Sequence, residues 1–402
     1  GHNLATQAAA DKAAAEQAAA EAAAKAAADA EALAAEVEAC RAELAALQAG
    51  DAERKALWER FVAISRADAE GIYARLNVSF TSWHGESFYH PRLPGVVESL
   101  QEAGLARESD GAIAVFFEDI ENLADKPFLV RKRDGAFLYA TTDLATIDHR
   151  VETYDPAQII YVVDVRQSLH FTQLFETARR RGATCVLDHV GFGMMLGNDG
   201  RPFRTRDGGT ITLASLLDEA EERILPLVAD KWPDADEASQ RAIASEVGIG
   251  AVKYADLSPN LQTDYRFDWD KLLAADGNTG PYLQYTLVRI RSILREHEVR
   301  FGHVYEPDGS PLILEAAEEL DLARELLKLG DVLDRVERNL RPHVICDYLY
   351  GLSRKYNPFY ASCPILKSEG DVLRSRMTLC ALTARTLELG LGCLNLPLLE
   401  RM

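Results

Sequence analysis

The hydrophobic and polar positions change their pattern three times along the chain. Residues 5–49 are dominated by alanine, with Glu, Lys and Gln interspersed, and they contain no proline and no glycine. Such residues are strong helix formers but leave no apolar stripe here, so they predict a long, solvent-exposed helix with little sequence specificity. Apolar residues then recur at roughly helical spacing between 57 and 76, which predicts a further helix.

Short apolar runs separated by polar segments occupy residues 111–213. The runs AIAVFF, PFLVRK, AFLYA, IIYVVD and TCVLDHV predict strands, and SLHFTQLFETARRRG predicts a helix that stops near Gly182. Strands that alternate with helices are typical of βαβ units, so we expect an α/β fold with a mainly parallel sheet. From Leu213 onward the spacing is helical apart from loops near 258–270 and 306–311, and residues 281–402 predict an all-helical bundle.

Composition narrows the class of protein only in part. No apolar run approaches the ~18 residues of a membrane span, and the six cysteines include no Cys-x-x-Cys pair. We therefore expect free thiols in a reducing compartment, no disulfide framework and no metal site. The formal net charge of −19 argues against general affinity for nucleic acid but is compatible with local basic patches. The alanine-rich start is also acid-rich, which is not typical of a transit peptide.

Polar side chains follow two of the predicted strands. Tyr139 ends one strand and Asp143 enters the next helix, while Gln167 and His170 follow the strand IIYVVD. If these two strands pair in parallel, the four side chains face one crevice at the carboxyl edge of the sheet. A carboxylate with amide and phenol groups suits a guanidinium ligand. The open alternative is a capped helix start, where Thr and Asp are favoured anyway.

The glycines of HVGFGMMLGNDGRPFRTRDGGT, residues 189–210, have two readings. Gly191 and Gly193 have the spacing that begins a dinucleotide fingerprint, but no helix is expected after them, and MML, NDG and PFRTR predict a β-hairpin instead. The glycine-bounded loop RTRDGG, with Arg204 and Arg206, is suited to closing cations over phosphates. A solvated basic hairpin is the alternative.

Two further features each have a structural and a functional reading. His189 is either a hydrogen-bonded structural residue or a contact to a base or ribose. The cationic stretches 179–181, 289–300 and 335–343 predict plain helix faces. Aromatic platforms stack on unpaired bases, so nearby tyrosines make single-stranded nucleic-acid contact the alternative. These tyrosines are Tyr282, Tyr285, Tyr348 and Tyr350.

Five stretches, taken together and in order, resemble arginyl-tRNA synthetase, a class I aminoacyl-tRNA synthetase. They are VRKRDGAFLYATTDLATI, IIYVVDVRQSLHF, HVGFGMMLGNDGRPFRTRDGGTITLASLLDEA, FDWDKLLAADGNTGPYLQYTLVRIRSI and LNLPLLERM. The resemblance covers roughly residues 41–402. It implies a partial class I Rossmann-like parallel sheet between an alanine-rich helical segment and a C-terminal all-α anticodon-binding bundle. The expected domains are 1–76, 77–277 with the second half of the catalytic domain, and 278–402.

The resemblance also implies roles for individual residues. Arginine recognition is implied for Tyr139, Asp143 and Gln167. ATP binding is implied for His189, Gly191, Gly193 and Arg204. The loop that takes the place of the KMSKS signature implies catalytic roles for Arg204 and Arg206, although Arg204 stands where the family usually has lysine. Contact with tRNA is implied for Asn278, Tyr282, Tyr285 and Arg289. No residue is implied as a metal ligand.

The activity implied is ATP-dependent activation of L-arginine, with Mg²⁺, and its transfer to tRNA-Arg. A monomer without membrane attachment is expected, in the cytoplasm or in an organelle stroma or matrix. The HIGH signature and the first half of the nucleotide-binding fold should lie upstream and are not in the sequence, so we expect a fragment. The alternatives are an inactive synthetase fragment or paralogue that binds tRNA, and a small-molecule-binding α/β protein with a helical interaction domain.

Overall fold

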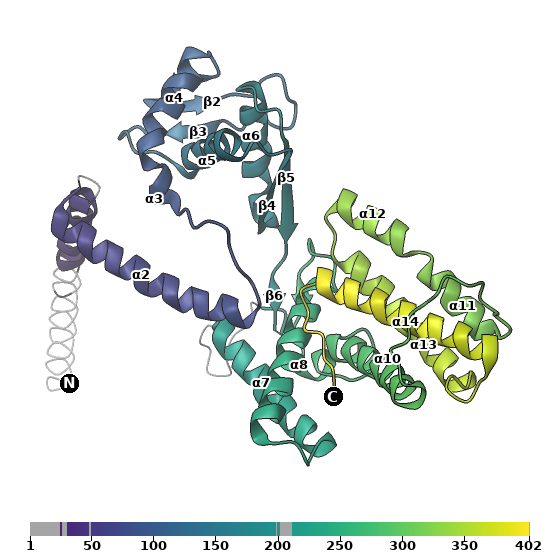
Figure 1. Cartoon of the computed structure of the whole chain (residues 1–402). Helices are drawn as coiled ribbons and strands as arrows, with labels where there is room; N and C mark the ends of the chain where they lie inside the picture. The colour runs from purple at the N-terminus through teal and green to yellow at the C-terminus, as the bar shows by residue number, and fades with distance from the viewer. Residues whose placement is uncertain (1–24, 26–29, 48–49, 198, 202–210, 402) are drawn as a thin grey trace, which may run out of the picture. The chain divides into compact units, whose positions relative to one another are not determined.

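The computed structural model describes residues 25, 30–47, 50–197, 199–201 and 211–401. These residues belong to two compact units, 1–78 and 79–402. The chain and its labelled elements are drawn in Figure 1.

The described residues of the first unit form mainly exposed helices. Residues 30–47 are helical and almost entirely exposed. Helix α2 (Ala52–Arg75) follows, and Asp51 caps it by accepting a hydrogen bond from the Arg54 backbone N–H at 3.1 Å. No side chain of α2 is buried. The helix predicted over 5–49 is confirmed for residues 25 and 30–47. The rest of that range lies outside the described residues. The helix predicted over 57–76 is confirmed.

An antiparallel sheet opens the second unit. Its strands are β1 (Ala106–Ser109), β2 (Ala112–Val115) and β3 (Phe128–Arg131), in the order β1-β2-β3, after α3 (Glu86–Tyr89), η1 (His90–Arg92) and α4 (Leu93–Glu102). The prediction of a mainly parallel sheet is wrong for these strands. Asp110 and Gly111 have φ of 51° and 77°, the two positive angles of a tight hairpin turn, so β1 and β2 must run antiparallel.

A βαβ unit follows and confirms the parallel part of the prediction. Strands β4 (Gln158–Asp164) and β5 (Val186–Phe192) pair in parallel, and η2 (Val165–Gln167) and α6 (Ser168–Arg180) connect them. Gly182 has a φ of 97°, a conformation that glycine adopts without strain, and the chain leaves the helix there as predicted. One face of the β4–β5 pair is buried through Ile159, Tyr161 and Leu187.

The predicted strand AFLYA does not form. Residues 132–136 make a turn in which the Lys132 N–H donates to the Ala136 carbonyl at 2.8 Å. Only Phe137 then pairs, as an isolated bridge to Arg131. The Leu138 carbonyl accepts the first helical hydrogen bonds, so α5 (Tyr139–Tyr154) begins where the strand was expected to end. As a result β4 pairs with β5 and not with this segment.

The sheets, α4, α5 and α6 share one hydrophobic core. Helix α6 contributes buried apolar side chains to this core at helical spacing, as its amphipathic pattern predicts. The largest fully buried side chains of this core are Leu100, Phe117, Leu144, Ile147 and Leu174.

Helices make up most of the rest of the chain, as predicted. They are α7 (Leu213–Lys231), α8 (Glu237–Leu257), α9 (Trp269–Leu272), α10 (Gly280–Phe301), α11 (Ala317–Leu326), α12 (Leu329–Asn339), α13 (His343–Ser362) and α14 (Gly370–Cys393). Two short strands, β6 (Met195–Leu196) and β7 (Tyr265–Arg266), pair in parallel. Helices α7 and α8 pack closely at Gly248, where a Cβ atom would lie 2.9 Å from the Ala220 backbone.

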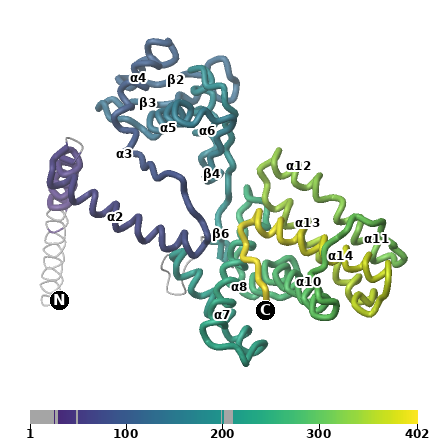
Figure 2. The backbone as a smooth tube through the Cα atoms, viewed as in Figure 1, coloured from purple at the N-terminus to yellow at the C-terminus, as the bar shows by residue number. Residues whose placement is uncertain are grey.

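The C-terminal helices confirm the predicted all-helical bundle. Figure 2 traces α10, α13 and α14 side by side. Their core is continuous, and its largest buried side chains are Tyr254, Tyr356, Phe359, Leu283, Leu287 and Ile290. The start of this bundle therefore has a fixed relation to the end of α8, which contributes Tyr254.

Candidate functional site

A carboxylate and an imidazole meet near the starts of α5 and α6. His170 Nε2 lies 2.7 Å from Asp143 Oδ2. The two side chains keep 25% and 33% of their surface exposed, so a ligand can still reach the pair. The His170 ring packs against Phe128 and Phe171, at centroid distances of 5.5 and 5.3 Å. The structure thus brings together two of the four residues expected in one crevice.

The other two residues lie on the same two segments. Tyr139 is the first residue of α5, one turn before Asp143, so both side chains project from the same face of the helix. Tyr139 is 69% exposed, and Gln167 is exposed at the end of η2, directly before α6. Neither side chain has a hydrogen-bond partner among the described residues. A phenol and a carboxamide are therefore available to a ligand near Asp143.

The alternative that Asp143 caps a helix is wrong. The N-cap residue of α5 is Leu138, and no side chain caps this end. Thr141 is fully buried, and its hydroxyl donates to the Val130 carbonyl of β3, which ties α5 to the sheet. Thr141 thus has a structural role, whereas the carboxylate of Asp143 is directed to His170.

A charged turn lies at the end of β4. Arg166 donates to both carboxylate oxygens of Asp164, at 2.9 and 2.6 Å, and its backbone N–H donates to the same carboxylate at 2.8 Å. These hydrogen bonds from Arg166 lower the pKa of Asp164 to about 2. The turn that carries Gln167 is therefore held by an ion pair.

The glycines near the end of β5 allow close backbone contacts. A Cβ atom on Gly191 would lie 3.1 Å from Val165 Cα, and one on Gly193 would lie 2.6 Å from the Thr263 carbonyl carbon. The Gly193 N–H donates to the Leu261 carbonyl at 2.7 Å. The described residues 193–197 are not helical, which agrees with rejecting the dinucleotide fingerprint. Because the Gly193 N–H already donates to Leu261, it is not available to a nucleotide. A nucleotide role for Gly193 would depend on the space left by its missing side chain.

His189 has a structural environment. Its ring stacks on Phe171 at 4.4 Å, and its Nε2 lies 3.0 Å from the Val163 carbonyl, to which it can donate. The ring is only partly exposed. The structural reading of His189 therefore has direct support, and a contact to a base or ribose would have to use Nδ1.

The predicted basic loop lies outside the described residues. Arg204 and Arg206 lie outside the described residues, as does the segment PFRTR of the predicted hairpin. The turn before it is present, since the Gly197 N–H donates to the Arg201 carbonyl at 2.7 Å. Strand β6, which contains Met195 and Leu196 of the predicted hairpin, pairs in parallel with β7.

A cation–aromatic cluster lies on α10, α13 and the end of α7. We define it by six residues, Lys231, Tyr282, Tyr285, Arg289, Asn357 and Tyr360. The Arg289 guanidinium lies 4.7 Å from the Tyr285 ring centre and 5.2 Å from that of Tyr360. Asn357 joins the two ends, accepting from Arg289 at 3.1 Å and donating to the Tyr282 hydroxyl at 2.8 Å.

The cluster keeps positive charge unpaired. Lys231 Nζ lies 5.2 Å from the Tyr285 ring centre, and hydrogen bonding from Arg289 lowers the pKa of Tyr285. Within the described part of the chain, neither Lys231 nor Arg289 pairs with a carboxylate. Three of the six residues were not predicted, although the polar and aromatic run KYNPFY on α13 carries a signal for Asn357 and Tyr360. Lys231 offers no such signal.

Two other residues predicted to contact nucleic acid lie outside the cation–aromatic cluster. Tyr348 belongs to the bundle core, and its hydroxyl donates to the Glu325 carbonyl, so it is no stacking platform. Asn278 lies outside the cation–aromatic cluster, and its Oδ1 accepts from the Tyr254 hydroxyl at 2.5 Å.

The cationic stretches mainly form ion pairs within the protein. Arg180 pairs with Asp119 and Glu176, and Arg181 pairs with Asp148. Arg291 is largely buried and pairs with Glu388. The reading of these stretches as structural helix faces is supported, with Arg289 as an exception.

Three further properties of the described residues concern metal binding, membrane-spanning helices and thiols. No group of three or more His, Cys, Asp or Glu side chains is arranged to hold a metal ion within them. Among the helices they form, none is long and apolar enough to cross a membrane. The six cysteines are free thiols.

Comparison with known proteins gives two family matches. The family model described as "tRNA synthetases class I (R), catalytic domain" matches residues 9–269. The one described as "DALR anticodon binding domain" matches residues 283–402.

Individual relatives agree with these matches. Arginine–tRNA ligase of Chromobacterium violaceum is 46% identical over 89% of this chain and 62% of the relative. That of Escherichia coli is 44% identical over 91% of this chain and 64% of the relative. The crystal structure of arginyl-tRNA synthetase from Plasmodium falciparum superposes with a TM-score of 0.76 at 26% identity, covering 90% of this chain and 61% of that one. The chain thus spans less than two thirds of the length of these relatives.

Proposed function

Because this chain belongs to the class I arginyl-tRNA synthetase family, we propose that it takes part in the ATP-dependent attachment of L-arginine to tRNA-Arg. The observation that carries this proposal is the Asp143–His170 pair. Asp143 supplies a carboxylate for the guanidinium of arginine, and Tyr139 and Gln167 supply hydrogen-bonding groups around it. His170 orients the carboxylate through Oδ2, which leaves Oδ1 for the substrate.

The reaction needs no side-chain nucleophile. The carboxylate of arginine attacks the α-phosphorus of ATP, forming arginyl-adenylate and releasing pyrophosphate. A ribose hydroxyl of the terminal adenosine of tRNA then attacks the arginyl carbonyl, and AMP leaves. The protein contributes positioning and stabilisation of phosphate charge. His189, Gly191 and Gly193 would border the adenosine, and Arg204 and Arg206 would approach the phosphates.

Mg²⁺ would accompany the phosphates of ATP. The described residues gather no set of three or more metal-ligating side chains. Mg²⁺ at nucleotide sites is usually held by one or two carboxylates together with the phosphates.

The domain assignment is part of the same proposal. Residues 77–277 would belong to the catalytic domain and residues 278–402 to the anticodon-binding domain, with the boundary just before α10. A monomer acting in the cytoplasm is proposed as well. The free thiols agree with a reducing compartment, and sedimentation of the purified chain would test the monomer.

Arginine binding tests the assignment of Asp143. The substitution Asp143→Asn keeps the shape but removes the charge, so the affinity for L-arginine measured by calorimetry should fall by at least about 10-fold. L-Citrulline, with a neutral urea in place of the guanidinium, should bind poorly to the unmodified chain. Glu152→Gln, on the same helix and paired with Arg92 at the surface, is the matched control and should leave the affinity unchanged.

The outcomes separate the site from the function. Unchanged affinity in Asp143→Asn would contradict the role of this carboxylate. Arginine-dependent charging of tRNA above a no-enzyme control would support the full reaction by this chain.

Binding of tRNA without charging is a second candidate function. The cation–aromatic cluster favours it, because unpaired cations beside aromatic rings suit an RNA strand. Retention of tRNA in a gel-shift assay, together with no charging, would support this candidate over the first.

A further inference from the structure

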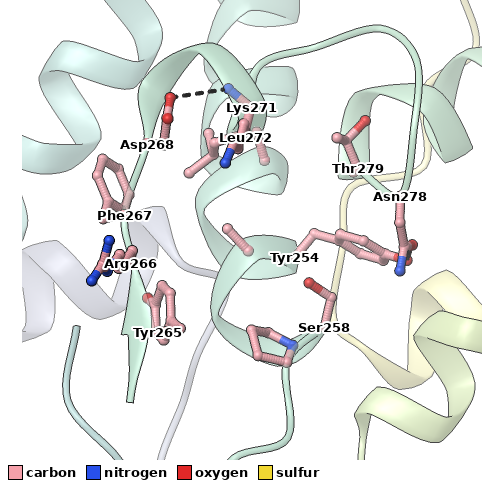
Figure 3. Close-up of a pocket in the computed structure, with 14 residues that line it drawn as sticks. Tyr254, Ser258, Tyr265, Arg266, Phe267, Asp268, Lys271, Leu272, Asn278 and Thr279 are labelled. Carbon is pink, nitrogen blue, oxygen red and sulfur yellow. Dashed lines mark hydrogen bonds between the residues drawn. The ribbon is translucent and has the colours of Figure 1, made fainter. Parts of the chain in front are cut away.

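A pocket of about 190 Å³ lies where the end of α8, the β7–α9 segment and the start of α10 meet. Figure 3 shows side chains entering from the helix in the centre, from Tyr265 to Leu272 on one side, and from Asn278 and Thr279 on the other. A cavity of ~150 Å³ can hold a benzene molecule. The pocket is therefore large enough for one planar heterocycle, and the reaction proposed above does not use it.

The walls of the pocket suit a flat ring. Ala251, Ala255 and Leu272 form small apolar surfaces, and the Tyr265 ring is partly exposed beside them. The Tyr265 hydroxyl donates to Asp256 Oδ1 at 3.1 Å, which fixes the ring in place. An aromatic ring held beside an apolar wall is a stacking surface for a nucleobase.

The rim of the pocket carries hydrogen-bonding groups and positive charge. Asn278 accepts from the Tyr254 hydroxyl through Oδ1, so its Nδ2 can donate to a ligand. Arg266 and Lys271 line the pocket, and neither forms an ion pair with a carboxylate in the described part of the chain. The neighbouring Asp268 is occupied in accepting from the backbone N–H groups of Asp270 and Lys271. The free cations can therefore bind phosphate.

The pocket also adjoins the cation–aromatic cluster along the chain. Thr279 lines the pocket and caps α10, and Tyr282 and Tyr285 follow one and two turns later on that helix. A strand of RNA that lies along the cluster can continue to the pocket. A free nucleotide would use the pocket but not the cluster.

We propose that this pocket receives one unstacked base of the bound tRNA. The base stacks on Tyr265, the Asn278 amide contacts its edge, and Arg266 and Lys271 contact the flanking phosphates. This inference rests on the proposed function, since it takes tRNA as the partner.

Pocket variants test the inference with a tRNA-Arg transcript as the probe. Ala255→Phe fills the pocket without changing charge, and Tyr265→Leu removes the stacking ring. Each should weaken binding by about 10-fold, because one base stack is lost. Tyr265→Phe keeps the ring and should bind within about 2-fold of the unmodified chain. Thermal melts of all variants establish that they are folded.

Chemical probing of the bound tRNA gives a second readout. One base should be protected by the unmodified chain and become reactive with Ala255→Phe, while protection elsewhere is retained. A merely structural effect of the substitution would not expose a single base.

Each outcome supports or overturns the inference. Equal affinity and identical protection with both pocket variants would overturn it and leave tRNA binding intact. Saturable binding of AMP that Ala255→Phe abolishes, with tRNA binding unchanged, would overturn the RNA occupant in favour of a free nucleotide. Absence of tRNA binding by the unmodified chain would overturn the inference together with the proposed tRNA partner, whereas the arginine titration would still stand.

Discussion

His149 is a buried histidine whose surroundings favour the neutral ring. It is 8% exposed and packs against His84, Phe88 and Tyr89, at centroid distances of 5.4, 5.1 and 5.7 Å. Its Nδ1 lies 3.2 Å from the Thr153 hydroxyl, and its buried Nε2 has no hydrogen-bond partner among the described residues. Burial, followed by the positive charge of Arg92, lowers the pKa of His149 below its ordinary value.

This lowered pKa predicts a loss of stability in mild acid. Between the ordinary pKa of about 6.5 and the lower folded value, the unfolded chain binds a proton that the folded chain does not. The stability that depends on the neutral His149 ring is thus fully present above about pH 6.5 and is lost as the pH falls toward the lower folded pKa. Urea midpoints should decrease between pH 7.5 and 5.5, and His149→Phe should reduce the decrease. His90 is exposed, so His90→Asn should leave this decrease unchanged. A decrease in His149→Phe as large as in the unmodified chain would contradict the prediction.

A buried carboxylate organises the start of α11. Glu319 is 1% exposed, and its Oε2 accepts from the backbone N–H groups of Glu315 and Ala316 at 2.7 and 2.9 Å. Its Oε1 accepts from Arg376 of α14 at 2.6 Å. Burial raises the pKa of Glu319, but the hydrogen bonds from Ala316 and Arg376 outweigh it and lower that pKa. The ion pair therefore links two helices of the bundle.

Breaking this pair should destabilise the bundle strongly. Arg376→Met leaves the Glu319 charge buried without its cation, which costs about 3–5 kcal/mol of unfolding free energy. Urea unfolding followed by circular dichroism measures the effect. Arg385→Met, on the same helix but paired with Glu306 at the surface, should change stability by about 0.5 kcal/mol or less. A similar value for both variants would contradict the argument.

At the scale of the whole molecule, net charge and local charge have opposite signs. The chain carries a formal net charge of −19, yet the cation–aromatic cluster and the pocket rim present cations without carboxylate partners in the described residues. Electrostatic repulsion by the acidic body is screened beyond ~10 Å at 0.1 M salt. Local cations, which displace counterions from phosphate, can therefore bind RNA on an acidic protein.

The salt dependence of the proposed tRNA binding should report this local contact. Removing one phosphate contact with Arg289→Gln should weaken binding and reduce the slope of log K against log salt by roughly 1. The slope can be measured by filter binding between 50 and 200 mM salt, a range over which the Debye length falls by roughly half. Arg385→Gln, outside the cluster, should keep the slope of the unmodified chain. An unchanged slope in Arg289→Gln would remove Arg289 from the tRNA contact.

The sequence by itself determined the helices from Leu213 onward, the β4–α6–β5 unit and the stop at Gly182. These features follow from local periodicity and from glycine conformation, which neighbouring residues specify. The sequence also contained the Asp110–Gly111 turn signal, which predicts an antiparallel hairpin when it is recognised.

Only the tertiary structure decided which distant residues meet. Asp143 and His170 are 27 positions apart, and Arg289 and Asn357 are 68 apart. The replacement of the expected strand at AFLYA by a turn and the start of α5 likewise depended on β3 folding back at Gly135. Such contacts depend on how whole elements pack, and periodicity along one segment carries no information about its partner. The sequence predicted Asp143 and His170 in one crevice, although through a strand pairing that does not form. It did not predict the grouping of Arg289 with Asn357.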